Sequence, residues 1–127
     1  MIYVASPYTN TDTKKQRQNL WLTEELMGRL YKKYQLFIVS PIIHWAAAAD
    51  ACDLPHRYEF WKPWDEACLR DSEAVWILML RGWETSEGVL HEIKLAEKLN
   101  KPIFLVDTNF LTLQEFTHDK IKLPHLG

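Results

Sequence analysis

The chain has 127 residues and a formal net charge of −2 at pH 7, with 47% hydrophobic and 25% charged residues. This length fits one domain spanning residues 1–127, and the composition excludes disordered, coiled-coil and collagen-like chains. The balanced charge gives no basis for binding a nucleic-acid polymer, although a few backbone N–H groups can still hold a single phosphate.

The cysteine, tryptophan and apolar patterns bear on location and assembly. Cys52 and Cys68 are the only cysteines, the N-terminus has no cationic signal-peptide region, and no stretch approaches the roughly 18 apolar residues of a membrane span. We therefore expect a cytoplasmic protein with no membrane association. The six tryptophans predict either a Trp-rich core or a self-association surface.

The first half of the chain alternates short apolar runs with helical patterns. Residues 2–5 predict a buried strand, and a capping box of Thr13 and Gln16 predicts a helix from Thr13 to about Tyr34. Residues 36–39 predict a second strand. Residues 46–51 are helix-prone, and residues 61–69 predict a further helix with Pro63 in its first turn.

The second half begins with the clearest strand, residues 74–80, which are apolar at every position as in a central strand covered on both faces. A loop at residues 81–85 precedes a helix from about Ser86 to Leu99, and residues 102–106 predict a fourth strand. The segment after Asp107 predicts a last helix near Leu113 and an edge strand or arm ending at Gly127.

This alternation of strands and helices predicts an α/β domain with a parallel sheet and helices on both faces. In such folds, ligands bind at the carboxyl ends of the strands, where the strand order reverses. The loops after Ala5, Val39 and Leu80 are therefore the expected site.

The helix after Leu80 carries the sharpest chemical signal. On a helical wheel, Glu92 falls inside the apolar arc formed by residues such as Val89, Ile93 and Ala96. Burying an ionised carboxylate costs several kcal/mol unless it is paired or hydrogen-bonded. Glu92 is therefore either a catalytic carboxylate or a structural Glu hydrogen-bonded to backbone or to a tyrosine.

The start of the same helix suits a small ligand. Ser86 is a natural N-cap, and Gly88 would let a ligand approach the backbone. Free N–H groups there could hold a phosphate or a sugar hydroxyl. The alternative is an ordinary cap with an incidental glycine, and no P-loop or dinucleotide-binding glycine motif is present.

Other candidates depend on position alone. Asp65 follows two tryptophans and could lie at the rim of an aromatic pocket, and Asp71 stands at the boundary of the central strand. His44, just after the second strand, could contact a ligand. Each could equally be a solvated surface residue. The five histidines show no metal-ligand spacing.

Together these segments resemble a known superfamily. The run Tyr3-Val4-Ala5-Ser6-Pro7-Tyr8, then Asp65 and Asp71, then Gly82-Trp83 and Ser86-x-Gly88-x-x-x-Glu92 are similar to the nucleoside 2-deoxyribosyltransferase superfamily, which includes 2'-deoxynucleoside 5'-monophosphate N-glycosidases. The pattern is most similar to a branch of small bacterial and phage proteins of unassigned substrate.

The resemblance implies a flavodoxin-like, Rossmann-like three-layer sandwich with a mainly parallel five-stranded sheet. It implies that Glu92 attacks the anomeric carbon to form a glycosyl-enzyme, that Tyr3 orients Glu92, and that Asp65 protonates the leaving base. Neither metal nor cofactor is needed for this chemistry. The resemblance also implies a homodimer or larger homo-oligomer.

The substrate is expected to be a nucleoside or a nucleoside 5'-monophosphate. Ser86 stands six positions before Glu92, where the transferases commonly carry Asp and the monophosphate N-glycosidases carry Ser, which favours hydrolysis of a nucleotide. Ser6 and the backbone around Tyr8 are the other candidate substrate contacts. Leu90, where those hydrolases usually carry Gly, departs from the pattern and leaves base exchange open. A non-catalytic nucleotide-binding module is the alternative of another class.

Overall fold

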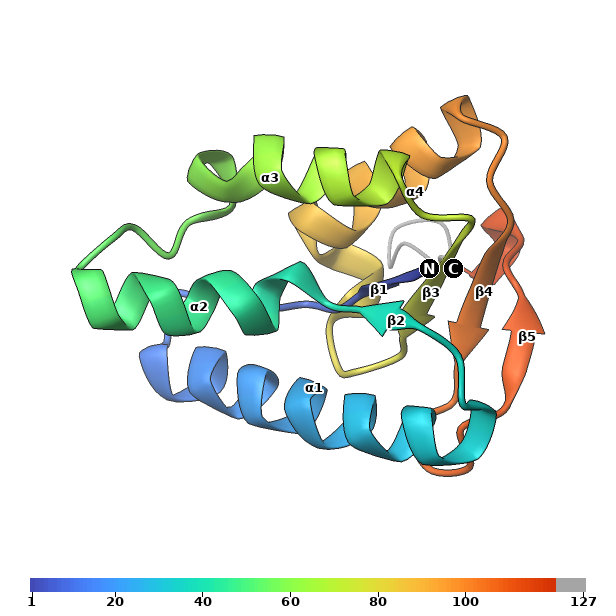
Figure 1. Cartoon of the computed structure of the whole chain (residues 1–127), viewed down its shortest axis with the longest axis horizontal. Helices are drawn as coiled ribbons and strands as arrows, with labels where there is room; N and C mark the ends of the chain where they lie inside the picture. The colour runs from blue at the N-terminus through green and yellow to red at the C-terminus, as the bar shows by residue number, and fades with distance from the viewer. Residues whose placement is uncertain (121–127) are drawn as a thin grey trace.

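The computed structural model of the chain describes residues 1–120, and its five strands form one sheet of order β2-β1-β3-β4-β5 (Figure 1). The pairs β1–β2, β1–β3 and β3–β4 are parallel, whereas β4–β5 is antiparallel. The strands are β1 (Ile2–Ala5), β2 (Ile38–Val39), β3 (Ala74–Leu78), β4 (Ile103–Val106) and β5 (Leu113–Glu115).

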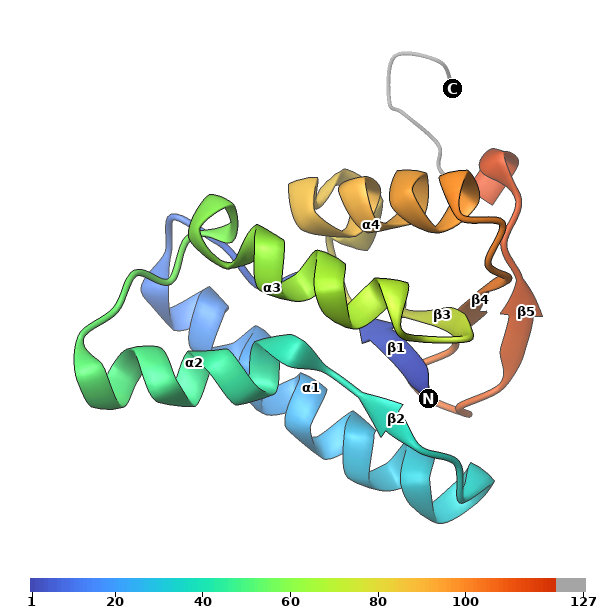
Figure 2. The same ribbon diagram turned by 45° about the horizontal axis from the view of Figure 1, so that its top comes forward.

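Helices cover both faces of the sheet. Helix α1 lies on one face, α3 and α4 lie on the other, and α2 lies beside α1 and α3 at the β2 side (Figures 1 and 2). Their bounds are α1 (Thr13–Tyr34), α2 (Pro41–Cys52), α3 (Tyr58–Arg70) and α4 (Glu87–Lys98), with 3₁₀ turns at η1 (Trp83–Thr85) and η2 (His118–Lys120). The predicted α/β fold with a mainly parallel five-stranded sheet is confirmed and is compatible with a flavodoxin-like three-layer sandwich.

The core divides between the two faces as the strand period requires. In β1, Val4 packs with Leu26 and Leu30 of α1, whereas Tyr3 and Ala5 belong to the cluster on the α3–α4 face. Every residue of β3 is buried, which confirms the predicted central strand. No helix within residues 1–120 combines the length and apolar character that crossing a membrane requires.

The predicted start of α1 at Thr13 is confirmed, but the predicted capping box of α1 and the predicted start of α3 are wrong. The N-cap of α1 is Asp12, whose side chain accepts from the N–H of Lys14, while Gln16 accepts from the N–H of Asn10 instead of closing a capping box at Thr13. Helix α3 begins at Tyr58, so Pro63 lies inside the helix and not in its first turn. Local pattern alone missed the extra turn because residues 58–60 carry no cap signal.

The predicted helix near Leu113 is wrong, because this segment is the edge strand β5. A tight turn explains the difference: Asp107 accepts from the N–H groups of Asn109 and Phe110, and Leu111 has φ 60°. The turn reverses the chain, so Leu113 pairs with Val106 of β4. The predicted arm ending at Gly127 lies outside the described residues.

The sheet order also positions a ligand site. From β1 the chain passes to β2 on one side and then to β3 on the other. The strand order therefore reverses between β1 and β3, and ligands of such sheets bind beyond the carboxyl ends of the strands at this point.

Candidate functional site

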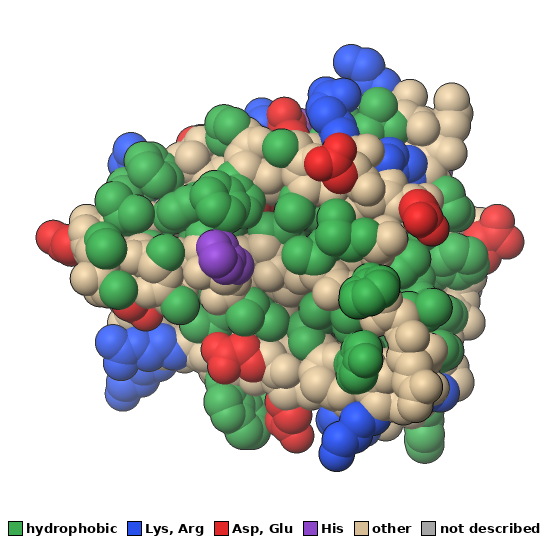
Figure 3. All heavy atoms as spheres, viewed as in Figure 1, with side chains coloured by type: hydrophobic (Ala, Val, Ile, Leu, Met, Phe, Trp, Pro, Cys, Tyr) green, Lys and Arg blue, Asp and Glu red, His purple; other side chains and the backbone are tan. Residues whose placement is uncertain are grey.

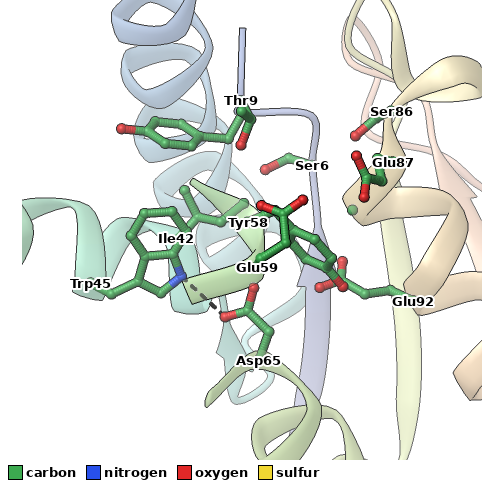
Figure 4. Close-up of a pocket in the computed structure, with 12 residues that line it drawn as sticks. Ser6, Thr9, Ile42, Trp45, Tyr58, Glu59, Asp65, Ser86, Glu87 and Glu92 are labelled. Atoms are coloured by element: carbon green, nitrogen blue, oxygen red, sulfur yellow. Dashed lines mark hydrogen bonds between the residues drawn. The ribbon is translucent and has the colours of Figure 1, made fainter. Parts of the chain in front are cut away.

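A cavity of about 140 Å³ lies at this reversal point (Figure 4). Pockets that enclose a drug-sized ligand are typically about 300–1,000 Å³, so this cavity suits one ring, with the rest of a larger ligand outside. Its lining residues come from the loop after β1 (Ser6, Tyr8, Thr9), from α2 (Ile42, Trp45), from α3 (Tyr58, Glu59, Asp65) and from the start of α4 (Ser86, Glu87, Gly88, Glu92).

Glu92 lies on the floor of the cavity and is 3% exposed, as the helical wheel predicted. The Tyr3 hydroxyl donates to Glu92 Oε2 at 2.5 Å, joining β1 to α4. Strand alternation turns Tyr3 toward the α4 face of the sheet, and the helical period turns Glu92 toward the sheet. The expected contact between these two residues is therefore present.

Asp65 faces the same cavity from α3 and is 1% exposed. Its Oδ1 accepts from Trp45 Nε1 at 3.0 Å, whereas its buried Oδ2 has no hydrogen-bond partner within residues 1–120. Figure 4 shows Asp65 and Glu92 entering the pocket from different helices. One oxygen of Asp65 is thus fixed in place and the other is available to a ligand.

The two carboxyl groups have strongly raised pKa values. Burial raises the pKa of Asp65 to about 7, and the Trp45 hydrogen bond opposes this shift. Burial and the nearby Asp65 raise the pKa of Glu92 to about 8, while the hydrogen bond from Tyr3 lowers it. Near neutral pH the pair therefore holds a proton that can be given to a ligand, and its apparent pKa values belong to both groups.

Tyr58 is a pocket residue that the sequence did not reveal. Its hydroxyl oxygen is buried without a hydrogen-bond partner in the described part of the chain, and burial together with Glu92 and Asp65 raises its pKa well above the ordinary value. A Cβ at position 88 would lie 3.2 Å from the Tyr58 ring. Gly88 therefore admits the Tyr58 ring, and it also lines the cavity, where its expected role of admitting a ligand to the backbone stays a prediction.

Ser86 is the N-cap of α4, as predicted, and accepts from the N–H of Val89 at 3.4 Å. Ser86 also lines the cavity, so it is placed for both of the roles considered for it. Ser6 also lines the cavity, and its hydroxyl accepts from Thr23 of α1 at 3.2 Å.

The Tyr8 side chain lines the cavity and is held by His56, which in turn contacts Asp50. Neither His56 nor Asp50 was predicted from the sequence as a site residue. The Tyr8 hydroxyl pairs with His56 Nδ1 at 2.8 Å, and His56 Nε2 lies 3.0 Å from Asp50 Oδ1. Trp45 packs edge-on against Tyr8, with ring centroids 5.3 Å apart. These contacts fix the loop after β1 against α2 and against the connection between α2 and α3.

Two predicted site residues lie elsewhere. His44 is on the exposed side of α2, stacked on Trp64, and the same helix presents Ile42 and Trp45 to the cavity instead. Asp71 is exposed at the C-cap of α3, just before the amino end of β3 and so at the opposite end of the sheet from the cavity. Asp71 stands six residues beyond Asp65, nearly two turns further along α3, which separates the two carboxyl groups by roughly 9 Å along the helix axis.

Two more carboxylates, Glu59 and Glu87, stand on the exposed part of the cavity lining. Glu87 lies within the Ser86-Glu87-Gly88 run that marked the site, whereas nothing in the sequence around Glu59 indicated a role. Within residues 1–120, no group of three or more His, Cys, Asp or Glu side chains is placed to hold a metal ion.

The chain matches one family model, the domain of unknown function DUF1937, over residues 1–108. It therefore belongs to this family. The matched range includes β1 to β4 and every residue that lines the cavity. A search of curated proteins gave no match to the chain.

Proposed function

We propose that the chain cleaves the N-glycosidic bond of a nucleoside, or of its 5'-monophosphate, through a glycosyl–Glu92 intermediate. The observation that carries this proposal is the buried Tyr3–Glu92 hydrogen bond of 2.5 Å beside Asp65 in one cavity. Retaining glycoside cleavage uses a pair of carboxyl groups at the scissile bond, and this ring-sized cavity presents two.

In the first step, a Glu92 oxygen attacks the anomeric carbon as the bond to the base nitrogen breaks. Asp65 Oδ2 has no protein partner and gives its proton to that nitrogen. The raised pKa values keep a proton on the Asp65–Glu92 pair near neutral pH, and the step starts from the form in which Asp65 holds this proton and Glu92 is ionised. The products of this step are the free base and a sugar ester of Glu92.

Tyr3 acts on the nucleophile and not on the substrate. Its hydrogen bond lowers the pKa of Glu92 and so favours the ionised form that attacks. The bond also holds one carboxylate oxygen, leaving the other to face the sugar. Tyr3 is therefore a positioning residue in this mechanism.

In the second step, water attacks the anomeric carbon, ionised Asp65 takes the proton from that water, and Glu92 is released. Ser86 at the cavity favours hydrolysis of a nucleotide by resemblance to the N-glycosidases. If a second base attacks in place of water, the reaction is base exchange, which is the second candidate. A binding module that has lost catalysis is the third.

The experiment is a chromatographic screen for free base. Wild type and Glu92→Ala are incubated with ribo- and deoxyribonucleosides and their 5'-monophosphates, with and without an acceptor base. We expect release in water by wild type and at least a ~10³-fold slower reaction by Glu92→Ala, since the covalent path is removed.

Ser86→Ala separates the substrate classes in the same screen. If Ser86 contacts a phosphate, this variant loses activity on monophosphates and keeps it on nucleosides. Release that requires an acceptor base would replace hydrolysis by transfer. Wild-type activity in Glu92→Ala, or no release from any compound, would contradict the proposed glycosidase.

A further inference from the structure

The charge of the cavity lining is one-sided. Four of its residues are acidic, and none of its residues, all within the described part of the chain, is Lys, Arg or His. The acidic residues are Asp65 and Glu92 on the buried floor, with Glu59 and Glu87 at the exposed rim. A ligand that enters this cavity therefore meets negative charge at two depths.

The two buried carboxyl groups have no positively charged partner within residues 1–120. Asp65 and Glu92 receive one hydrogen bond each, from Trp45 and Tyr3, both of which are uncharged donors. Asp65 Oδ2 has no partner although the residue is 1% exposed. Buried carboxylates are ordinarily paired with a cation or hydrogen-bonded throughout, so this floor lacks a positive partner that a ligand can supply.

Basic side chains lie near the cavity but do not line it. Lys62 and Lys94 line a separate surface hollow that meets the cavity at Tyr58 and Glu87. Glu66, the other acidic group close to Glu92, is paired with His91 at 2.5 Å. Neither lysine lines the cavity that holds Asp65 and Glu92.

The uncharged walls suit a flat ring. Trp45 and Tyr58 present aromatic side chains to the cavity, and Trp45 is held by stacking on Trp61 with centroids 5.0 Å apart. A planar heterocycle can pack against such walls, whereas an anion cannot bring a favourable charge to them.

We infer that the substrate is a cationic N-glycoside, in which the ring nitrogen bonded to the sugar belongs to a positively charged heterocycle such as a pyridinium or an N-alkylated purine. This inference rests on the proposed function and narrows its substrate class. Near neutral pH Asp65 and Glu92 hold a proton between them, and a bound cation lowers both pKa values and so favours their carboxylate forms.

The chemistry of such a substrate is balanced without an added reactant. A Glu92 oxygen forms a bond to the anomeric carbon, and the electron pair of the breaking C–N bond neutralises the positive ring, which leaves as a neutral base. Water then displaces Glu92 from the sugar, and its proton goes to Asp65 and on to solvent. In this case Asp65 is an electrostatic partner in the first step and a base in the second.

Matched pairs of nucleosides that differ in charge test the inference. Nicotinamide riboside is compared with its uncharged 1,4-dihydro form, and 7-methylguanosine with guanosine, each in ribose and 2-deoxyribose forms. Binding to Glu92→Gln is measured by calorimetry at neutral pH. This variant blocks attack and keeps an oxygen for Tyr3, while Asp65, Glu59 and Glu87 remain to face the cation. We expect the cationic member of at least one pair to bind about tenfold more tightly.

Charge removal at the rim provides the internal control. Glu59→Gln with Glu87→Gln, in the same background, should reduce the preference for the cation about threefold, because two exposed carboxylates act through solvent. Glu115→Gln removes one negative charge from β5, at the far edge of the sheet, and should leave the preference unchanged, whereas Glu59→Gln and Glu87→Gln should each reduce it. Equal effects of Glu115→Gln and of either rim change would show a net-charge effect only and would overturn the assignment to this cavity.

Failure of the inference and failure of the proposed function give different results. Equal or tighter binding of the neutral members, or no binding of any cationic member, overturns the inference, while base release by wild type still supports the glycosidase. If the protein prefers cations but releases no base from any compound, the inferred charge selectivity is supported and the proposed glycosidase activity is contradicted.

Discussion

At the residue scale, the site depends on two carboxyl groups that destabilise the empty protein. Asp65 and Glu92 are buried, each accepts one uncharged hydrogen bond, and each has a raised pKa. The groups that face Glu92 are Tyr3 from β1, Tyr58 and Asp65 from α3, and Glu66, which His91 pairs. Burying these two carboxyl groups therefore lowers the stability of the folded chain.

The first residue-scale prediction concerns pH and stability. The pKa of Asp65 rises from 3.8 to about 7 and that of Glu92 from 4.5 to about 8. At pH values between the ordinary and the raised pKa, the folded protein therefore binds more protons than the unfolded chain. The free energy of unfolding should then fall as pH rises from about 4 to about 8. Thermal denaturation of Glu92→Gln and Asp65→Asn should show a flatter pH dependence and, at pH 8, a gain of about 2 kcal/mol. Parallel curves for wild type and both variants would contradict the raised pKa values.

The second residue-scale prediction concerns Tyr3→Phe. Removing the hydroxyl removes the hydrogen bond that lowers the pKa of Glu92. The acidic limb of the kcat/KM profile should move to higher pH, and kcat should fall by about 10- to 100-fold. A variant that lost activity through misfolding alone would keep the wild-type pH profile in its residual activity, so the profile separates positioning from structure.

Glu92 and Tyr3 could be predicted because regular periods fix where their side chains point. The 3.6-residue period placed Glu92 among apolar residues of α4, and the family resemblance supplied Tyr3 as its partner. His44 and Asp71 could not be placed this way, because their orientation depends on how α2 and α3 cross the sheet. Tyr58 and Glu59 were missed since they lie in the first turn of a helix whose start the pattern did not show.

At the element scale, the contact between the first turns of α3 and α4 shapes the cavity. Gly88 of α4 lies against the ring of Tyr58 from α3, and both residues line the cavity. A glycine here costs helix propensity but allows this approach. The same contact keeps the Tyr58 hydroxyl close to the acidic floor.

Gly88→Ala tests that contact. A Cβ 3.2 Å from the Tyr58 ring must displace the ring, so kcat/KM should fall about tenfold while helix propensity limits the loss of stability. Gly28→Ala is the matched control, because nothing lies within 4 Å of a Cβ at this exposed position of α1. It should raise the free energy of unfolding by about 0.5–1 kcal/mol with unchanged activity. Equal activity in the two variants would show that the Tyr58 position does not matter.

Element types were predictable where the apolar pattern was long, as in α1, β3 and α4. They were not predictable where a turn decided the outcome. The segment at Leu113 has no strong period, and it is a strand because the Asp107 turn sends it back along β4. The short β2 likewise differs from the predicted strand at residues 36–39, since Phe37 is 85% exposed and only Ile38 and Val39 pair with β1.

At the whole-molecule scale, the sheet order places the loop after β1 and the start of α4 side by side, which sequence alternation had predicted through the reversal rule. Several aromatic side chains are exposed on the surface of the folded molecule. Phe60 and Trp64 of α3 are 45% and 47% exposed, and Trp64 stacks on exposed His44 of α2. Figure 3 shows hydrophobic side chains gathered over α2 and α3 on this side of the molecule.

We predict that the expected homo-oligomer forms through this face of α2 and α3. Light scattering should give a dimer or larger assembly for wild type and a smaller species for Phe60→Ser with Trp64→Ser, because exposed aromatic residues are typical interface anchors. Trp21→Ser is the matched control, since Trp21 is 62% exposed on α1, away from α3. A monomer at every concentration would contradict self-association, and an unchanged assembly in the double variant would move it to another face.

The claim that Glu92 is a glycosylated nucleophile can be tested by trapping. A 2-fluoro substituent on the sugar slows both steps through the oxocarbenium-like transition state, so the glycosyl-enzyme should accumulate. Peptide mass spectrometry after incubation with 2'-fluorinated nucleosides, neutral and cationic, should show one sugar without its base on the peptide that carries Glu92, and none in Glu92→Gln. Base release without this adduct, or an adduct on another residue, would contradict the account.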